Sequence, residues 1–233
     1  MSLDNEKKET LERESGVVLS RYVKERVPKA FSGGKVKFRE YATLVEDMSS
    51  LIDKTEANIE IESTCRKGCA ACCSHSILVN GFEVEVILNY IERNYDYETR
   101  KAIKQRINDT ANRLDATLGP APRNTNELKN ILEHEEEIKT NYFELQLPCP
   151  LLNEQQECMV YPVRPSPCWT YRSYGDPDVC NTTFDVPHTI NYIGHEEYYS
   201  VVKAKSIDAG TITNRKSYVL AGFLPQKLRD AIF

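Results

Sequence analysis

The 233-residue sequence has no long hydrophobic run: no window reaches the roughly 18 to 20 apolar residues that a membrane-spanning helix needs. The first eight residues, MSLDNEKK, contain no apolar region of the kind found in a secretory leader. Its 30 Lys and Arg residues are interspersed among 35 Asp and Glu residues, so the net charge of −5 carries no basic stripe. These absences predict a cytoplasmic protein that binds neither a membrane nor a nucleic acid.

The sequence also lacks the glycine-rich fingerprint G-x-G-x-x-G that would indicate a nucleotide-type cofactor pocket. It shows no internal repeat. Because 40% of the residues are hydrophobic, the chain has enough apolar side chains to bury a core of ordinary composition. A folded globular protein is therefore expected, and its chemistry has to come from something other than a nucleotide-binding loop.

The sequence is rich in cysteine, and its cysteines are clustered. Four of the eight cysteines lie in the run CRKGCAACC at residues 65–73, and the other four lie between residues 149 and 180. The first three follow a C-x3-C-x2-C spacing, which lets a tight loop direct several sulfurs to one centre. Small Gly and Ala residues between them let backbone N–H groups approach the sulfurs. A zinc or iron–sulfur centre held by thiolates is the resulting hypothesis.

Both cysteine segments supply candidate ligands. The candidates are Cys65, Cys69, Cys72, Cys73, Cys149, Cys158 and Cys168. Four thiolates complete a site, so the count fits two four-coordinate centres or one centre with spare thiols. Adjacent side chains diverge in an extended chain, so we expect one of Cys72 and Cys73 to serve the main centre and the other to face elsewhere. Disulfides are a weaker alternative, because the expected compartment is reducing and a vicinal pair bridges poorly.

The two segments together carry a family resemblance. The pattern C-x3-C-x2-C-C, followed by CPLL at 149–152, a further Cys and YPVRPSPC at 161–168, resembles the zinc- or iron-chelating cysteine-cluster proteins called YkgJ-like or CxxCxxCC proteins. This family commonly has Arg after the last cysteine, where this chain has Trp169, and Arg172 is a candidate replacement. The resemblance implies metal chelation. Through the related flagellin lysine N-methylases it more distantly implies methyl transfer to protein lysines. Cys180 lies outside the pattern and is expected to matter less.

The metal and the activity are separate questions. A clustered loop completed by a remote cysteine beside proline favours an iron–sulfur cluster such as [4Fe–4S], whereas structural zinc more often uses two separated C-x2-C pairs. Radical S-adenosylmethionine enzymes share the C-x3-C-x2-C spacing, but the helices predicted after it do not supply their βα units. We favour a metal-binding protein over the alternative, a metal-dependent enzyme such as a protein lysine N-methyltransferase that uses S-adenosylmethionine. A protein partner or substrate is left open.

Other side chains near the thiols have predicted supporting roles. Trp169 is expected to pack over and shield the site. Cations beside the thiols are expected to offset the surplus negative charge of a tetrathiolate centre, with surface solvation as the alternative: Arg66, Lys67, Arg164 and Arg172. Three histidines are secondary ligand candidates: His75, His188 and His195. The acidic run 133–137 is interpreted as a solvated helix face, because consecutive side chains point around a helix.

Hydropathy patterns predict a mainly α fold, a helical domain around an irregular cysteine-rich metal-binding core with few or no strands. The expected division is an N-terminal helical region at 1–58 and a cysteine-cluster domain at 59–233, or one continuous domain. Apolar periodicity and capping signals place helices at residues 3–27, 38–52, 80–91, 96–118, 128–145 and 188–208, with a short terminal helix through Leu228 and Ile232. A short extended segment is expected at 59–63, and a proline-stiffened irregular region at 148–187.

Overall fold

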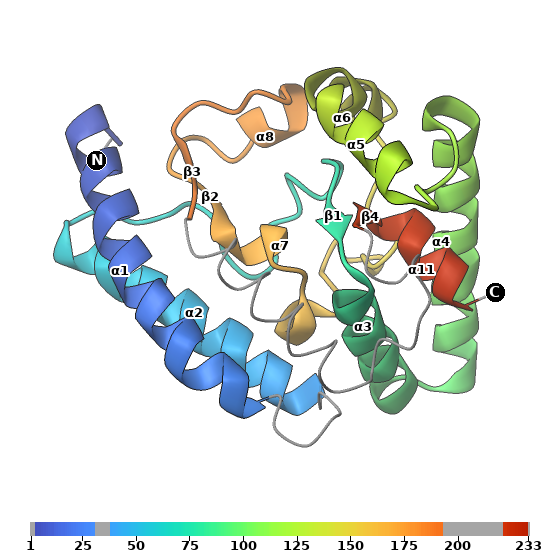
Figure 1. Cartoon of the computed structure of the whole chain (residues 1–233), viewed down its shortest axis with the longest axis horizontal. Helices are drawn as coiled ribbons and strands as arrows, with labels where there is room; N and C mark the ends of the chain where they lie inside the picture. The colour runs from blue at the N-terminus through green and yellow to red at the C-terminus, as the bar shows by residue number, and fades with distance from the viewer. Residues whose placement is uncertain (1–2, 31–37, 193–220, 233) are drawn as a thin grey trace. The chain divides into compact units, whose positions relative to one another are not determined.

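The computed structural model describes residues 3–30, 38–192 and 221–232 (Figure 1). Its elements confirm the mainly α prediction. The helices are α1 (Asn5–Ala30), α2 (Phe38–Asn58), α3 (Gly81–Asn94), α4 (Tyr97–Leu118), α5 (Thr125–Glu133), α6 (Glu135–Glu144), α7 (Pro167–Thr170), α8 (Val179–Thr182) and α11 (Leu224–Ile232), with a 3-10 turn at Tyr161–Val163. None of the described helices is both long and apolar enough to cross a membrane. The chain break that Gly33 and Gly34 predict at 32–34 lies outside the described residues. The helix predicted at 188–208 is wrong in its first residues, where strand β3 (Thr189–Asn191) forms instead, and its remainder from residue 193 lies outside the described residues.

The chain forms two compact units, each built from two segments. The first unit contains residues 1–67 and 162–213, and the second contains residues 68–161 and 214–233. The boundary at residue 67 falls inside the cysteine run, so the cysteines are shared between the units. The division at residue 58 that the sequence suggested stays a prediction.

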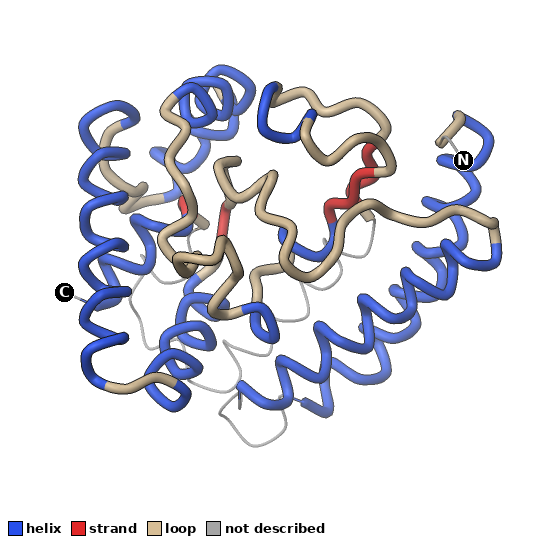
Figure 2. Tube along the Cα trace, turned by 180° about the vertical axis from the view of Figure 1, so that it is seen from behind, coloured by secondary structure: helices blue, strands red, loops and turns tan. Residues whose placement is uncertain are grey.

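In the first unit, α1 lies along α2 (Figure 2). The predicted apolar stripe of α2 is confirmed, with buried residues Tyr41, Leu44, Val45, Met48 and Ile52. On α1 the buried positions include Leu11, Leu19 and Val23, whereas Val18, at helical spacing from Leu11, is 36% exposed. The helix also continues past Pro28 to Ala30, contrary to prediction. A proline this close to a helix end removes only one backbone donor, so the last turn can still form.

In the second unit, local capping signals define the helix starts. The side chain of Asn80 accepts from the Glu83 amide while the Glu83 side chain accepts from the Asn80 amide, which completes the predicted capping box. Asp96 caps α4 by accepting from the amide of Thr99. The buried face of α4 is Ile103, Ile107, Ala111 and Leu114, and α11 packs against α4 and α3. The predicted helices at 80–91 and 96–118 are therefore confirmed.

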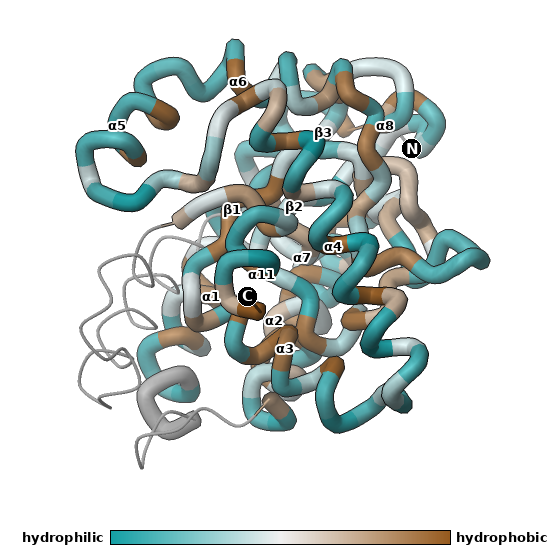
Figure 3. Tube along the Cα trace, turned by 90° about the vertical axis from the view of Figure 1, so that its right-hand side faces the viewer, coloured by the Kyte–Doolittle hydropathy of each residue, from teal (hydrophilic) through white to brown (hydrophobic). Residues whose placement is uncertain are grey.

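The single helix predicted at 128–145 is wrong, because the chain breaks at His134 into α5 and α6. No residue of α5 is buried, and Leu132 is 47% exposed. In Figure 3 both helices are mostly hydrophilic, with isolated apolar positions. The reason is visible in the sequence: between Leu132 and Ile138 there is no apolar residue to hold the middle of a continuous helix against the core.

Strands are few and short. In the second unit β1 (Leu78–Val79) pairs antiparallel with β4 (Gly222–Phe223), and in the first unit β2 (Tyr171–Ser173) pairs antiparallel with β3 (Thr189–Asn191). The segment 59–63 is a turn followed by coil and forms no strand, because Glu60 adopts a left-handed backbone with φ of 53°. Residues 148–187 are turns, coil and short elements, which confirms the irregular region.

Candidate metal centre

Four thiols of the second unit come together from two distant segments. The first two belong to a turn at residues 71–74, where the Cys73 amide donates to the Ala70 carbonyl at 2.9 Å and the His75 amide donates to the Cys72 carbonyl at 3.0 Å. The turn curls the chain, and the side chains of Cys72 and Cys73 are hydrogen-bonded to each other. Our expectation that they diverge is therefore wrong, because it assumed an extended backbone.

The other two thiols belong to a hairpin at residues 149–159. A bridge between Leu152 and Cys158 closes it, and the Met159 amide donates to the Leu151 carbonyl at 2.9 Å. The hairpin is tied to the turn by its first residue, since the Cys149 amide donates to the Cys73 carbonyl at 2.8 Å. This one backbone bond brings the two cysteine segments side by side.

The thiols influence one another electrostatically. Burial raises the pKa of the Cys149 thiol to about 12. A backbone hydrogen bond from Leu151 lowers this pKa, as does Arg106, whereas the neighbouring Cys158 and Cys72 raise it further. The pKa of Cys72 is well above its ordinary value, first because of its hydrogen bond with Cys73 and then because of burial. The four thiols thus form one interacting group, in which burial favours the neutral form of Cys72 and Cys149.

Helices α3 and α4 support the hairpin. The Tyr95 hydroxyl, just after α3, donates to the Met159 carbonyl at 2.5 Å. From α4, Arg106 donates to the Pro150 carbonyl and to the Met159 sulfur. Sequence reasoning missed both side chains, because nothing in their spacing from the cysteines links them to the site. His75, a secondary ligand candidate, packs edge-on against the Phe143 ring at a centroid distance of 5.0 Å.

The remaining predicted site residues are distributed as follows. Cys69 is half-buried in the second unit. Cys65 and Cys168 are exposed and belong to the first unit, as does the buried Cys180. The sulfur of Cys65 accepts a hydrogen bond from the Ser173 amide at 3.3 Å, so β2 holds this thiol in place.

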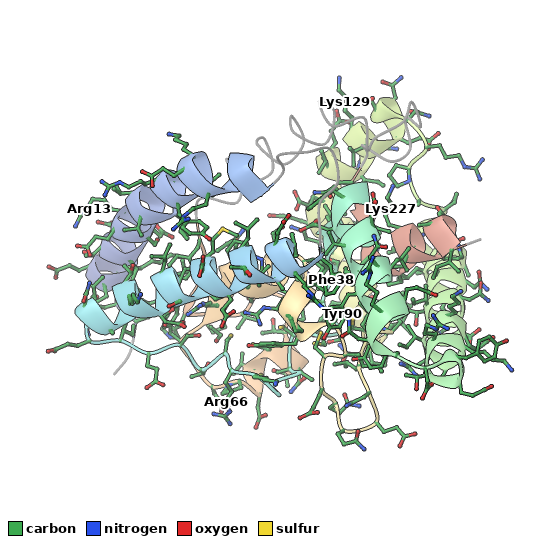
Figure 4. All side chains as sticks on the ribbon, turned by 90° about the horizontal axis from the view of Figure 1, so that it is seen from below. Arg13, Phe38, Arg66, Tyr90, Lys129 and Lys227 are labelled. Carbon is green, nitrogen blue, oxygen red and sulfur yellow. The ribbon has the colours of Figure 1, made fainter. Side chains whose placement is uncertain are left out.

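Trp169 is 3% exposed, which agrees with a packing role. Of the predicted charge-balancing cations, Arg66 is exposed and points outward (Figure 4), and Lys67 is also exposed. The prediction is wrong for Arg172, because this buried guanidinium binds the carboxylates of Asp53 and Glu56 at 2.5 and 3.0 Å. Its charge is used within the first unit to join β2 to α2.

The acidic run and one of the two remaining histidine candidates can also be placed. The acidic run 133–137 is mostly exposed, as expected for a solvated face, and Glu135 pairs with Lys139 one turn along. His188 is exposed, and His195 lies outside the described residues. Oxygen and imidazole donors therefore add little to the site, and sulfur remains its donor chemistry.

None of the eight cysteines forms a disulfide. Across residues 3–30, 38–192 and 221–232, no three Cys, His, Asp or Glu side chains already stand in the geometry that holds a metal ion. The donor chemistry of the four neighbouring thiols nevertheless fits zinc or iron, since thiolates are preferred ligands of both. Binding would draw the sulfurs together, and the turn and the hairpin are short segments that can adjust.

Comparison with known proteins agrees with this donor set. Searches of curated proteins and of solved structures gave no match. A family model matches residues 64–190, more than half of the chain, and its description is CxxCxxCC, "Putative zinc- or iron-chelating domain". That range includes every cysteine of the sequence. The chain belongs to the CxxCxxCC family of zinc- or iron-chelating domains.

Proposed function

We propose that the protein chelates one zinc or iron centre through Cys72, Cys73, Cys149 and Cys158. The observation that supports this choice is the 2.8 Å bond from the Cys149 amide to the Cys73 carbonyl, which joins the turn to the hairpin. Electrostatic interaction of Cys149 with both Cys72 and Cys158 supports the same grouping. Four thiolates from one unit satisfy the usual coordination number of a thiolate-bound metal.

A bound metal would cross-link the turn to the hairpin, so chelation and folding of these segments would be coupled. The turn carries few backbone bonds of its own, and the metal would supply a cross-link between two distant parts of the chain. The main role of the centre is therefore structural, and an iron–sulfur cluster would add a redox function. Cys69 in the same unit provides a further thiol for such a cluster.

For the metal we propose an iron–sulfur cluster, supported by the remote Cys149 next to Pro150, with Cys69 from the C-x3-C-x2-C run as a further thiol beside Cys72. Cys65 and Cys168 in the first unit stay predictions as ligands. A cytoplasmic location stays a prediction as well, and it would keep the free thiols reduced. The lysine methyltransferase alternative rests on the sequence resemblance alone.

The test is metal and sulfide analysis of protein purified without oxygen. Cys149→Ser and Cys72→Ser should each lose most of the bound metal, whereas Cys180→Ser, which removes a thiol of the first unit, should retain it. Full metal retention in Cys149→Ser and Cys72→Ser would contradict the four-thiol site. Stoichiometric zinc without sulfide would support the site and overturn the iron–sulfur proposal.

A further inference from the structure

Arg106 is half-buried on α4 and holds both ends of the Cys149–Met159 hairpin. Its Nε donates to the carbonyl of Pro150 at 3.1 Å, and its Nη2 donates to the Sδ of Met159 at 3.3 Å. Pro150 directly follows Cys149, and Met159 directly follows Cys158. One guanidinium therefore contacts the chain beside two of the four proposed ligands.

The hydrogen-bond partners of this guanidinium differ from those of other arginines in the structure. Two other arginines bind carboxylates: the buried Arg172 those of Asp53 and Glu56, and the half-buried Arg229 that of Asp115. Arg106 instead bonds to a carbonyl and a thioether, and in the described part of the chain no carboxylate forms an ion pair with it. A half-buried cation without a counter-ion is costly, which indicates that an anion belongs beside it.

That anion is identified by what else faces Arg106. The two groups that Arg106 contacts each lie beside a proposed thiolate ligand, since Pro150 follows Cys149 and Met159 follows Cys158. The Tyr95 hydroxyl faces the same hairpin through the Met159 carbonyl, but it carries no charge at neutral pH. The anion that suits Arg106 is therefore a thiolate centre.

We infer that Arg106 positions the hairpin ligands and balances the charge of the metal centre, an inference that rests on the proposed function. A divalent cation with four thiolates carries two surplus negative charges, and Arg106 offsets one of them. A guanidinium stays protonated in proteins, so this charge is permanent. Its planar fork also reaches both ends of the hairpin at once, which a lysine ammonium does not reproduce.

The experiment is a Zn²⁺ titration of the reduced, metal-free chain in competition with a chromophoric chelator. Arg106→Met removes the charge and both hydrogen bonds at similar volume, and it should weaken Zn²⁺ binding about 10- to 100-fold. Arg106→Lys keeps the charge and should lose less than about tenfold. The matched control is Arg113→Met, at an exposed position on the same helix, which should bind Zn²⁺ within about twofold of the wild type.

Hydrogen exchange of the metal-free chain gives a second readout, in which the amides of residues 149–159 should exchange faster in Arg106→Met than in the wild type. Unchanged exchange there would overturn the positioning role. If the wild type binds Zn²⁺ and Arg106→Met binds it with nearly the same affinity, the inference about Arg106 is overturned and the proposed function stands. Equal losses in Arg106→Lys and Arg106→Met would overturn the charge-balancing role. A wild type without measurable Zn²⁺ or iron binding would overturn the proposed function itself.

Discussion

Replacement of Glu56 by Gln should destabilise the first unit more than any other single-atom change on α2. Glu56 is 4% exposed, and its Oε1 accepts from Arg172 at 3.0 Å, from the Tyr174 hydroxyl at 2.7 Å and from the Tyr192 hydroxyl at 3.2 Å. The Tyr174 and Tyr192 hydroxyls are also hydrogen-bonded to each other. Its Oε2 accepts from the Ser63 amide at 3.4 Å. The carboxylate thus joins α2 to β2, to the residue after β3 and to the chain just before Cys65.

The magnitude follows from which of these bonds a Gln side chain can keep. Its carbonyl oxygen still accepts from the tyrosines, but the bond to Arg172 loses its charge assistance, which costs about 1 to 1.5 kcal/mol. The new amide nitrogen then faces the Ser63 N–H or the other donors, at a cost of about 1 kcal/mol or more. Arg172 keeps its 2.5 Å contact with Asp53, but that side chain is 64% exposed, so solvent weakens the compensation. The free energy of unfolding should fall by about 2 to 3 kcal/mol.

Urea unfolding followed by the fluorescence of Trp169, the only tryptophan, reports on this unit because the indole is buried within it. The matched control is Glu46→Gln, an exposed position on the same helix, which should change the free energy by less than about 0.5 kcal/mol. A loss of under about 0.5 kcal/mol in Glu56→Gln would refute the argument that this carboxylate organises the unit. An equal loss in both variants would show that net charge, and not the network, is responsible.

Three further predictions follow from the same structure. Burial and the hydrogen bond with Tyr192 raise the pKa of Tyr174 far above its ordinary value, so its contribution to stability is intact below about pH 10 and is lost above it, by up to about 1.4 kcal/mol per pH unit. Urea unfolding at pH 9 and 11 should show a shallower decline for Tyr174→Phe, and an identical decline would refute the assignment. Asn80→Ala should cost about 1 kcal/mol in thermal unfolding because it removes the capping box of α3, and an unchanged melting temperature would speak against it. A strong chelator should speed hydrogen exchange at residues 149–159 more than in α4, and uniform or absent changes would argue against a metal cross-link there.

The elements that could be predicted from the sequence are those fixed by neighbouring residues. The starts of α3 and α4 were predicted from Asn80 and Asp96, because an N-cap acts on amides two or three residues away. The stripe of α2 was predicted because its apolar residues keep one period over four turns. Where the period fails, as between Leu132 and Ile138, the sequence suggested continuity that the structure does not have.

The thiolate chemistry could be predicted from the sequence, but which thiols lie near one another could not. Cysteine density and the family pattern indicated thiolate chemistry, and the family model confirms a zinc- or iron-chelating domain. Which thiols are neighbours depends on backbone bonds such as that between Cys149 and Cys73, and such long-range bonds leave no periodic signal. The bend at Cys72 also depends on turn geometry, which a C-x2-C-C spacing does not specify.

Arg172 and Arg106 show that the distance of a cation from the cysteines along the sequence does not predict its role at the site. Sequence proximity placed Arg172 near the thiols, yet its charge is satisfied by two carboxylates of α2, and that pairing makes it part of the scaffold. Arg106 is more than 30 residues from any cysteine in sequence, yet its guanidinium lies between the ends of the cysteine hairpin without a carboxylate partner in the described residues. A half-buried cation with no carboxylate partner among the described residues departs from the rule that buried charges are paired, and such departures are tolerated where function requires them. The charge that the scaffold leaves unpaired is thus the one that a thiolate metal centre would complete.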